Sequence, residues 1–215
     1  AHPFTVIPVD GEKLDANVAI FIKVAGTFTQ KLADRLNGED LQDLQMSLRG
    51  PWGSRPRFVS PMAFVAGGVG VTPALSLLKS HTGSALFWAS RSEALVQNAY
   101  PLLPNLHSLS CVKVNGNLVH GQDVASISEW LEKVTEHHAA EGRHTGTIFV
   151  CGPARMSEEV RRAVKARGVQ WQVHTEEFRF LPEMFQPRRS ERPRANITKR
   201  KEELSMIPEG VPTYV

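Results

Sequence analysis

The chain has 215 residues, 41% hydrophobic and 22% charged, which is typical of a soluble globular protein with one large or two small domains. Its formal net charge of +3 is too small to indicate a nucleic-acid partner. Cys111 and Cys151 are the only cysteines and lie far apart without metal-type neighbours, so the sequence predicts neither a structural disulfide nor a metal site.

The first predicted elements are strands. Pro3 fixes the backbone after His2, and Thr5 follows at strand spacing, so this segment reads as an edge strand. The apolar stretch Val18–Val24 is also strand-like.

A short helix follows at the next glycine. Gly26–Thr29 leads into a helical pattern over Gln30–Leu36, which Gly38 closes. The free N–H groups at a helix start bind phosphate, and Thr29 and Gln30 are the closest candidates. The alternative is that Thr29 is only an N-cap.

The next segment combines a buried strand, a glycine loop and a helix start. Ala63–Ala66 is apolar, Gly67, Gly68 and Gly70 follow, and a helix is predicted over Thr72–Lys79. Glycines remove Cβ where a pyrophosphate must approach the backbone, so this loop is a candidate phosphate site. Within it, Thr72 is the predicted N-cap and Pro73 the first helical residue. A tight turn without a ligand is the alternative.

A third candidate loop follows the apolar strand Ala85–Ala89. Ser90 and Arg91 come directly after this strand, and a helix is predicted over Glu93–Ala99. An arginine at this place holds a ribose 2′-phosphate in dinucleotide-binding folds. A solvated arginine at a helix start is the alternative.

The pattern continues with a strand over Ser108–Val114, a loop over Asn115–Ser126 and a helix over Ile127–Ala140. His137 and His138 are adjacent on this helix, so we expect them to point to different faces and to bind no metal.

The last strand–helix–strand unit carries the second cysteine. Thr147–Cys151 is apolar, and Cys151 therefore lies at the carboxyl end of a strand. The candidate cofactor contacts Gly152, Pro153 and Met156 follow, ahead of a predicted helix over Ser157–Arg167 and a strand over Val169–Phe178.

This alternation of strands and helices predicts an α/β fold with a doubly wound parallel sheet over residues 59–180. In such sheets ligands bind outside the carboxyl ends of the strands, so the candidate loops are expected on one edge. Residues 181–215 form a basic tail, with charges in Pro187–Arg194 and Lys199–Lys201. That tail is expected to be solvated or to contact an anionic membrane surface.

Four motifs resemble one known family. Gly68–Pro73, Trp88–Arg91, Cys151–Pro153 and the His2–Thr5 segment occur in the order seen in the dehydrogenase half of ferric reductases and NADPH oxidases, a branch of the ferredoxin–NADP reductase superfamily. The resemblance covers roughly residues 2 to 180.

The resemblance implies a role for each motif. The Gly67–Pro73 loop holds the NADPH pyrophosphate, Ser90 and Arg91 hold its 2′-phosphate, and Cys151 packs beside the nicotinamide rather than acting as a nucleophile. Residues of the flavin part are His2, Pro3, Phe4 and Thr5 along the ring, Thr29 and Gln30 at the pyrophosphate, Arg49–Gly53 at the close of the barrel, and Phe178 as the stacking ring, with Phe180 as the alternative.

The implied function is hydride transfer from NADPH to FAD, followed by single-electron transfer to haem in an absent upstream domain of a membrane flavocytochrome, most closely of the ferric reductase type. The segment itself is expected to be soluble, at the cytoplasmic face of the membrane. Residues 1–58 correspond to only the later strands of an antiparallel FAD-binding barrel, so the chain alone is expected to hold FAD weakly. The alternatives are a soluble flavin-dependent NADPH reductase and a non-catalytic truncated binding module.

Overall fold

The computed structural model describes residues 5, 7–8, 18–24, 26–38, 58–81 and 83–176. The chain divides into two units, Ala1–Phe178 and Arg179–Val215, and every described residue belongs to the first. The predicted contacts His2, Pro3, Phe4 and Phe178, the Arg49–Gly53 turn and the basic tail lie outside the described residues.

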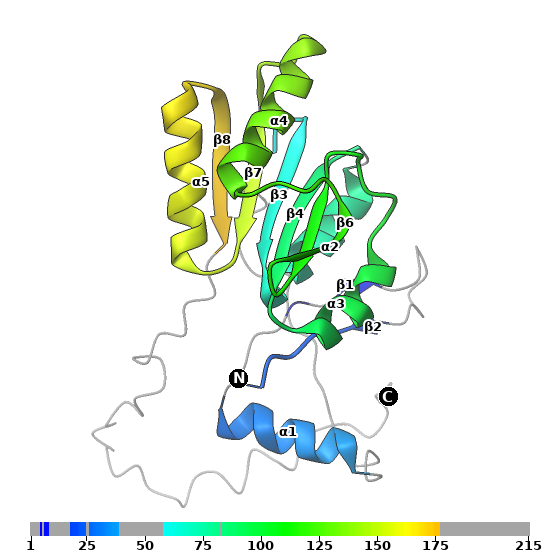
Figure 1. Ribbon diagram of the computed structural model, residues 1–215. Helices are drawn as coiled ribbons and strands as arrows, with labels where there is room; N and C mark the ends of the chain where they lie inside the picture. The colour runs from blue at the N-terminus through cyan, green and yellow to red at the C-terminus, as the bar shows by residue number, and fades with distance from the viewer. Residues whose placement is uncertain are drawn as a thin grey trace, which may run out of the picture. The chain divides into compact units, whose positions relative to one another are not determined.

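A mixed six-stranded sheet forms the centre of the described part (Figure 1). Its strands, in spatial order, are β6 (Asn117–Gly121), β5 (Cys111–Val114), β4 (Ala85–Ser90), β3 (Met62–Gly67), β7 (Thr145–Cys151) and β8 (Gln170–Glu176). All neighbours run parallel except β5 and β6, which are antiparallel. The predicted α/β class is therefore confirmed, with one antiparallel edge strand that the sequence reading placed in a loop.

The β5–β6 reversal has a local cause. Asn115 and Gly116 both adopt positive φ, 52° and 85°, which a two-residue hairpin turn requires. The turn folds Asn117–Gly121 back along β5, so the prediction of a loop over Asn115–Ser126 is wrong for this strand.

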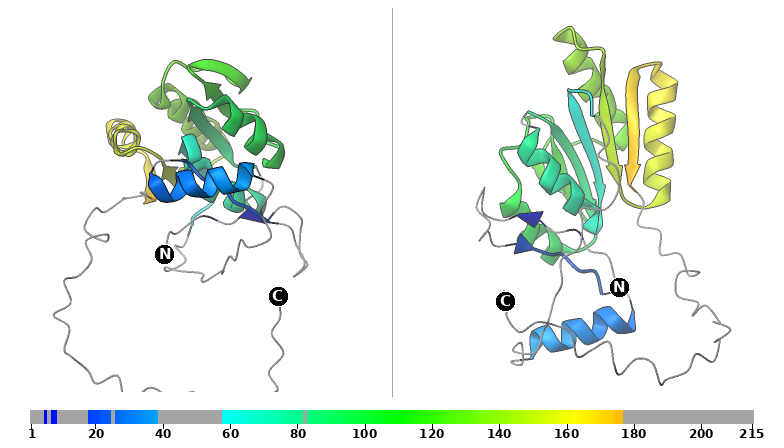
Figure 2. Two further views of the ribbon diagram at one scale, coloured as in Figure 1. Left: turned by 90° about the horizontal axis from the view of Figure 1, so that it is seen from below. Right: turned by 180° about the vertical axis from the view of Figure 1, so that it is seen from behind.

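Helices cover both faces of the sheet, as the view from behind in Figure 2 shows for α2 and Figure 1 for α4. The helical segments that pack with the sheet are η1 (Gly68–Gly70), α2 (Val71–Ser80), α3 (Glu93–Ala99), η2 (Tyr100–Leu102), α4 (Ile127–Ala140) and α5 (Ala154–Arg167). No helix in the described ranges is both long and apolar enough to cross a bilayer.

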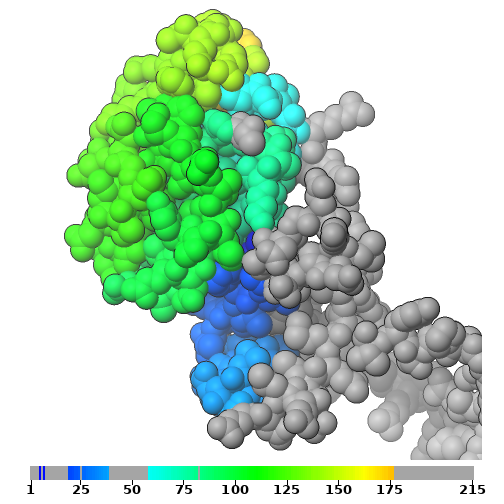
Figure 3. Space-filling view, turned by 90° about the vertical axis from the view of Figure 1, so that its right-hand side faces the viewer, coloured from blue at the N-terminus to red at the C-terminus, as the bar shows by residue number. Residues whose placement is uncertain are grey.

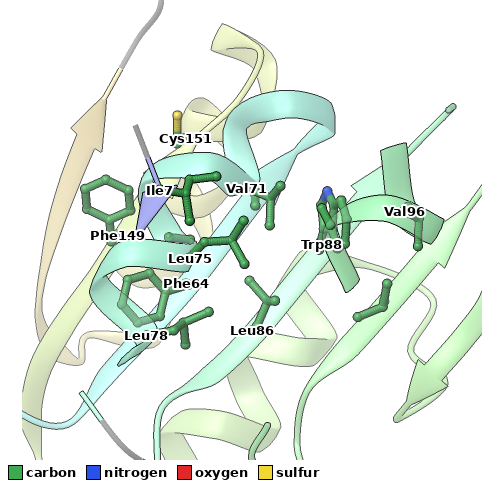
Figure 4. Packing of buried hydrophobic residues seen from close by; sticks show 14 of the residues in the cluster. Ile7, Phe64, Val71, Leu75, Leu78, Leu86, Trp88, Val96, Phe149 and Cys151 are labelled. Carbon is green, nitrogen blue, oxygen red and sulfur yellow. The ribbon is translucent and has the colours of Figure 1, made fainter. Parts of the chain in front are cut away.

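One core lies between the sheet and the α2–α3 face (Figure 4). Phe64 and Leu86 from the central strands pack there with Leu75 of α2, and all three are fully buried. Ile7 of β1 (Ile7–Pro8) is fully buried in the same core. β1 pairs antiparallel with β2 (Val18–Ala19), so only the first two residues of the predicted strand Val18–Val24 are in a ladder.

A second core lies under α4 and α5. Trp130 of α4 is fully buried, its ring centroid is 5.7 Å from that of Phe87, and its Nε1 donates to Leu109 O at 2.7 Å. Val160 of α5 and Trp171 of β8 belong to the same core. The central strands are covered on both faces, and this is why their sequences are nearly continuously apolar.

Helix α1 (Thr27–Asn37) begins earlier than predicted. Its N-cap is Gly26, and Thr29 lies inside the first turn. Gly26 N–H donates to Thr29 Oγ1 and Thr29 Oγ1 donates to Gly26 O, both at 3.1 Å. Thr29 is therefore not the N-cap residue itself, and its hydroxyl closes the first turn of the helix.

Candidate functional site

A cleft of about 1390 Å³ lies at the carboxyl ends of the parallel strands. This edge is the switch point of the sheet, because the chain leaves β3 toward β4 on one side and returns to β7 on the other. Residues from four strand ends line the cleft, among them Gly67, Gly68, Ser90, Arg91, Asn115, Gly116, Pro153 and Met156. Ala19–Val24 lines its other side, and in Figure 3 this blue segment lies directly beneath the green surface of the body.

Gly68 is the glycine that remains open. It has φ +54°, and a Cβ built on it would meet no atom within 4 Å. Trp88 Nε1 donates to Gly68 O at 3.0 Å, which holds the peptide that follows this residue in one orientation. A ligand can therefore approach the Gly68 backbone closely, as the phosphate-site prediction requires.

The other three glycines serve the packing of two loops. A Cβ at Gly70 would overlap the carbonyl oxygen of Cys151 and lie 2.7 Å from its carbonyl carbon. A Cβ at Gly67 would lie 2.6 Å from Pro153 Cδ, and one at Gly152 would lie 3.1 Å from Gly67 N. The space that Gly70 leaves is thus filled by the β7 backbone and does not open into the cleft.

The start of α2 differs from the prediction. The turn η1 precedes α2. The N-cap of α2 is Gly70, and no side chain caps this helix. Thr72 is the second helical residue and Pro73 the third, and both are buried. The prediction that Thr72 caps this helix and that Pro73 is its first residue is wrong, because the glycine turn moved the start toward the strand.

The turn after β4 is held by its own hydrogen bonds. Ser92 N–H donates to Ser90 Oγ at 3.0 Å, and Leu95 N–H donates to Ser92 Oγ at 3.2 Å, which caps α3. Asn115 N–H donates to Ser90 O at 2.9 Å and ties the hairpin to the same turn. Arg91 is exposed on the cleft and makes no ion pair with any residue that the structure describes.

Cys151 is fully buried beneath this edge. Burial, with a smaller contribution from the Glu176 carboxylate, raises the pKa of its thiol to about 12. A thiol that stays protonated is a poor nucleophile, so nothing in this environment favours a nucleophilic role for Cys151. In this arrangement its sulfur faces Gly70 and does not line the cleft.

We expect Cys151 to resist alkylation in the folded chain. At pH 8, a pKa of about 12 in place of 9.0 lowers the thiolate fraction roughly a thousandfold. A Cys111→Ser variant is treated with iodoacetamide and analysed by mass spectrometry. Cys151 should stay unmodified in the folded chain and should be fully labelled in urea. Because the pKa is raised in the folded state, the protonated thiol contributes fully to the free energy of unfolding below about pH 9. This contribution is lost as the pH rises toward 12. Rapid labelling of the native chain at pH 8 would contradict the burial.

The cleft unites some of the predicted residues and not others. Gly67, Gly68, Ser90, Arg91, Pro153 and Met156 line it. Gln30 lines a separate hollow of about 500 Å³ with Gly26 and Lys31, and Thr5 is half-buried elsewhere. The sequence reading missed Asn98 and the Asn115-Gly116 pair, although an Asn-Gly pair after an apolar strand is a hairpin signal.

No model of a protein family matches the sequence, and a search of the curated proteins found no match.

Proposed function

We propose that the chain is the NADPH-binding dehydrogenase region of a flavin-dependent oxidoreductase, passing a hydride from NADPH to FAD and single electrons onward to haem in a membrane flavocytochrome of the ferric reductase type. The observation that carries the proposal is the cleft at the switch point of the sheet, with the open Gly68 backbone on one strand end and Arg91 on the next. Ligands of open α/β sheets bind at this place.

The dimensions of the cleft favour an extended ligand. Pockets for small ligands usually enclose about 300–1000 Å³, and this cleft is larger at about 1390 Å³. Gly68 offers the cleft a backbone surface without Cβ, which is the close approach that a pyrophosphate needs.

Arg91 supports NADPH over NADH. Its guanidinium is exposed on the cleft beside a turn that four hydrogen bonds hold in place. A planar guanidinium suits the 2′-phosphate that distinguishes NADPH from NADH. The chain's own contribution would be to bind and orient the dinucleotide, while the bound cofactors supply the hydride chemistry.

The flavin part of the proposal has its support in the sequence resemblance. The candidates His2, Pro3, Phe4 and Phe178 lie outside the described residues. Helix α1 is present with Gln30 in its first half. Membrane association and the upstream haem domain likewise follow from the resemblance.

The preference for NADPH is tested with Arg91→Ala. Loss of a charge-assisted hydrogen bond costs about 1.5–3 kcal/mol, so we expect NADPH to bind roughly tenfold to a hundredfold more weakly, with NADH nearly unchanged. Arg162→Ala is the matched control, because Arg162 is an exposed arginine of α5 that does not line the cleft. Calorimetric titration with both dinucleotides decides the matter, and equal losses for both would remove the 2′-phosphate assignment.

Flavin-dependent NADPH oxidation separates this proposal from its alternatives. NADPH oxidation that depends on added FAD supports a dehydrogenase, and an electron acceptor that is a small soluble molecule would favour a soluble flavin-dependent reductase. A chain that binds NADPH and never reduces flavin, even with the upstream segment supplied, is the outcome expected of a non-catalytic binding module.

A further inference from the structure

A histidine–carboxylate cluster lies at the amino-terminal edge of the sheet, away from the cleft. His137 and His138 end α4, and Glu141 is the residue that caps it. The rings of His107, which precedes β5, and of Trp171, at the start of β8, pack against this pair. Both neighbours belong to the amino ends of their strands, whereas the cleft lies at the carboxyl ends.

Both adjacent histidines reach the same carboxylate. His138 Nδ1 is 3.2 Å from Glu141 Oε2, and His137 Nε2 is 3.8 Å from Glu141 Oε1. The two ring centroids are 5.3 Å apart. One ligand atom from each residue lies within 4.8 Å of the other two. As expected of adjacent helical residues, the two side chains differ in burial, with His137 39% and His138 3% exposed, yet both reach Glu141.

Packing fixes the orientation of His138. Its side chain is only 3% exposed, with the Trp171 ring centroid 5.7 Å away. A carboxylate only accepts hydrogen bonds, so Nδ1 donates to Glu141, and the buried Nε2 has no hydrogen-bond partner among the described residues. Binding of a metal through Nδ1 would displace this proton to Nε2, which stays without a hydrogen-bond partner among the described residues, so the support for a site lies in the two imidazoles that face one carboxylate.

We propose that His137 Nε2, His138 Nδ1 and the Glu141 carboxylate bind one divalent transition-metal ion of the zinc type. Imidazole with a carboxylate suits zinc, whereas magnesium and calcium prefer oxygen ligands alone. Ligands at 2.0–2.1 Å in a tetrahedron lie about 3.4 Å apart, so the present separations of up to 4.8 Å must contract. His137 and Glu141 are 39% and 42% exposed at a helix end, which leaves them free to move.

His107 and Arg143 lie beside the three proposed ligands, and neither acts as a ligand itself. His107 Nδ1 accepts from Leu109 N–H at 3.2 Å, so in its neutral form Nε2 carries the proton, and this ring is a wall of the site and not a ligand. A fourth position is left for water. Arg143 contacts the same Glu141 oxygen as His138 and is 49% exposed, so it competes with the metal for the carboxylate.

The first test is a calorimetric titration of the full chain with zinc chloride. The second is a titration with cobalt(II), whose visible absorption intensifies on tetrahedral coordination. We expect saturable binding of one ion. Glu141→Gln and His137→Ala should each weaken it roughly tenfold or more, since even the outer partners of metal ligands are typically worth about 10–100-fold. Arg143→Ala should strengthen binding, because it removes the competing cation.

His120→Ala is the matched control, since His120 is an exposed histidine of β6 outside the cluster. Zinc binding in this variant should equal that of the unaltered chain. Zinc should also raise the thermal midpoint of the unaltered chain and not that of Glu141→Gln. Absence of saturable zinc binding, or an unchanged affinity in Glu141→Gln or His137→Ala, would overturn the proposal.

Discussion

Replacing Gly70 with alanine is expected to destabilise the sheet unit by more than about 4 kcal/mol, or to prevent it from folding. The added Cβ would overlap the carbonyl oxygen of Cys151 and lie 2.7 Å from the carbonyl carbon. Both atoms belong to the backbone of β7, which is held in register with β3 through the Ala66–Cys151 pair. Since the overlap is between a Cβ and a backbone carbonyl, no side-chain rotation relieves it, and either η1 or β7 would have to shift. Urea denaturation followed by circular dichroism measures the loss.

Gly68→Ala is the control for this change. The added methyl group meets no atom within 4 Å, and the positive φ of +54° costs about 1–2 kcal/mol. This variant should fold and should bind NADPH much more weakly, because its Cβ occupies the surface that a pyrophosphate would approach. Wild-type stability in Gly70→Ala would show that the β3 and β7 loops are not packed as described.

The second large effect is expected at Trp88. Its side chain is fully buried in the α2–α3 core, so truncation to alanine removes a large apolar surface and leaves a cavity. Such changes cost about 3–5 kcal/mol. The same ring donates from Nε1 to Gly68 O at 3.0 Å, which links the core to the open glycine of the cleft.

Trp88→Phe separates the two roles. It keeps most of the apolar ring but removes the donor, so stability should fall by about 1 kcal/mol for the hydrogen bond, together with a smaller packing loss. Trp130→Phe is the matched control, because it removes an indole donor to Leu109 O on the opposite face. We expect Trp88→Phe alone to weaken NADPH binding by calorimetry. Equal nucleotide affinity in the two variants would remove the positioning role of Trp88.

Local sequence patterns predicted most of the helices and strands of the six-stranded sheet and its covering layers. The helices Glu93–Ala99 and Ile127–Ala140 have the bounds expected from their sequences, since Ser92 and Ser126 cap them as serines usually do. The apolar strands were found because both faces of the sheet are covered, which leaves few polar residues in them. Arg91 was placed correctly on the cleft because it follows β4 directly.

Contacts between distant segments could not be predicted in this way. The role of Gly70 depends on Cys151, which lies on a different strand. Thr72 looked like a cap because the short turn η1 cannot be distinguished from a loop by composition. The contacts of His137 and His138 with Glu141, by contrast, have the i,i+4 and i,i+3 spacing of helix neighbours; they were missed because the predicted helix ended at Ala140, one residue before Glu141.

The glycine contacts also determine which positions selection can release. Gly70 is required by the backbone of β7, and Gly67 and Gly152 pack against each other and against Pro153 and Met156, so a lineage without the proposed nucleotide site would retain them to keep the loops packed. Gly68 is favoured only by its positive φ, which costs another residue about 1–2 kcal/mol, and Arg91 makes no ion pair with a described residue, so Arg91 would drift first. In a descendant, the glycines at 67, 70 and 152 would therefore report loop packing, whereas a cation retained at position 91 would report use of the proposed nucleotide site.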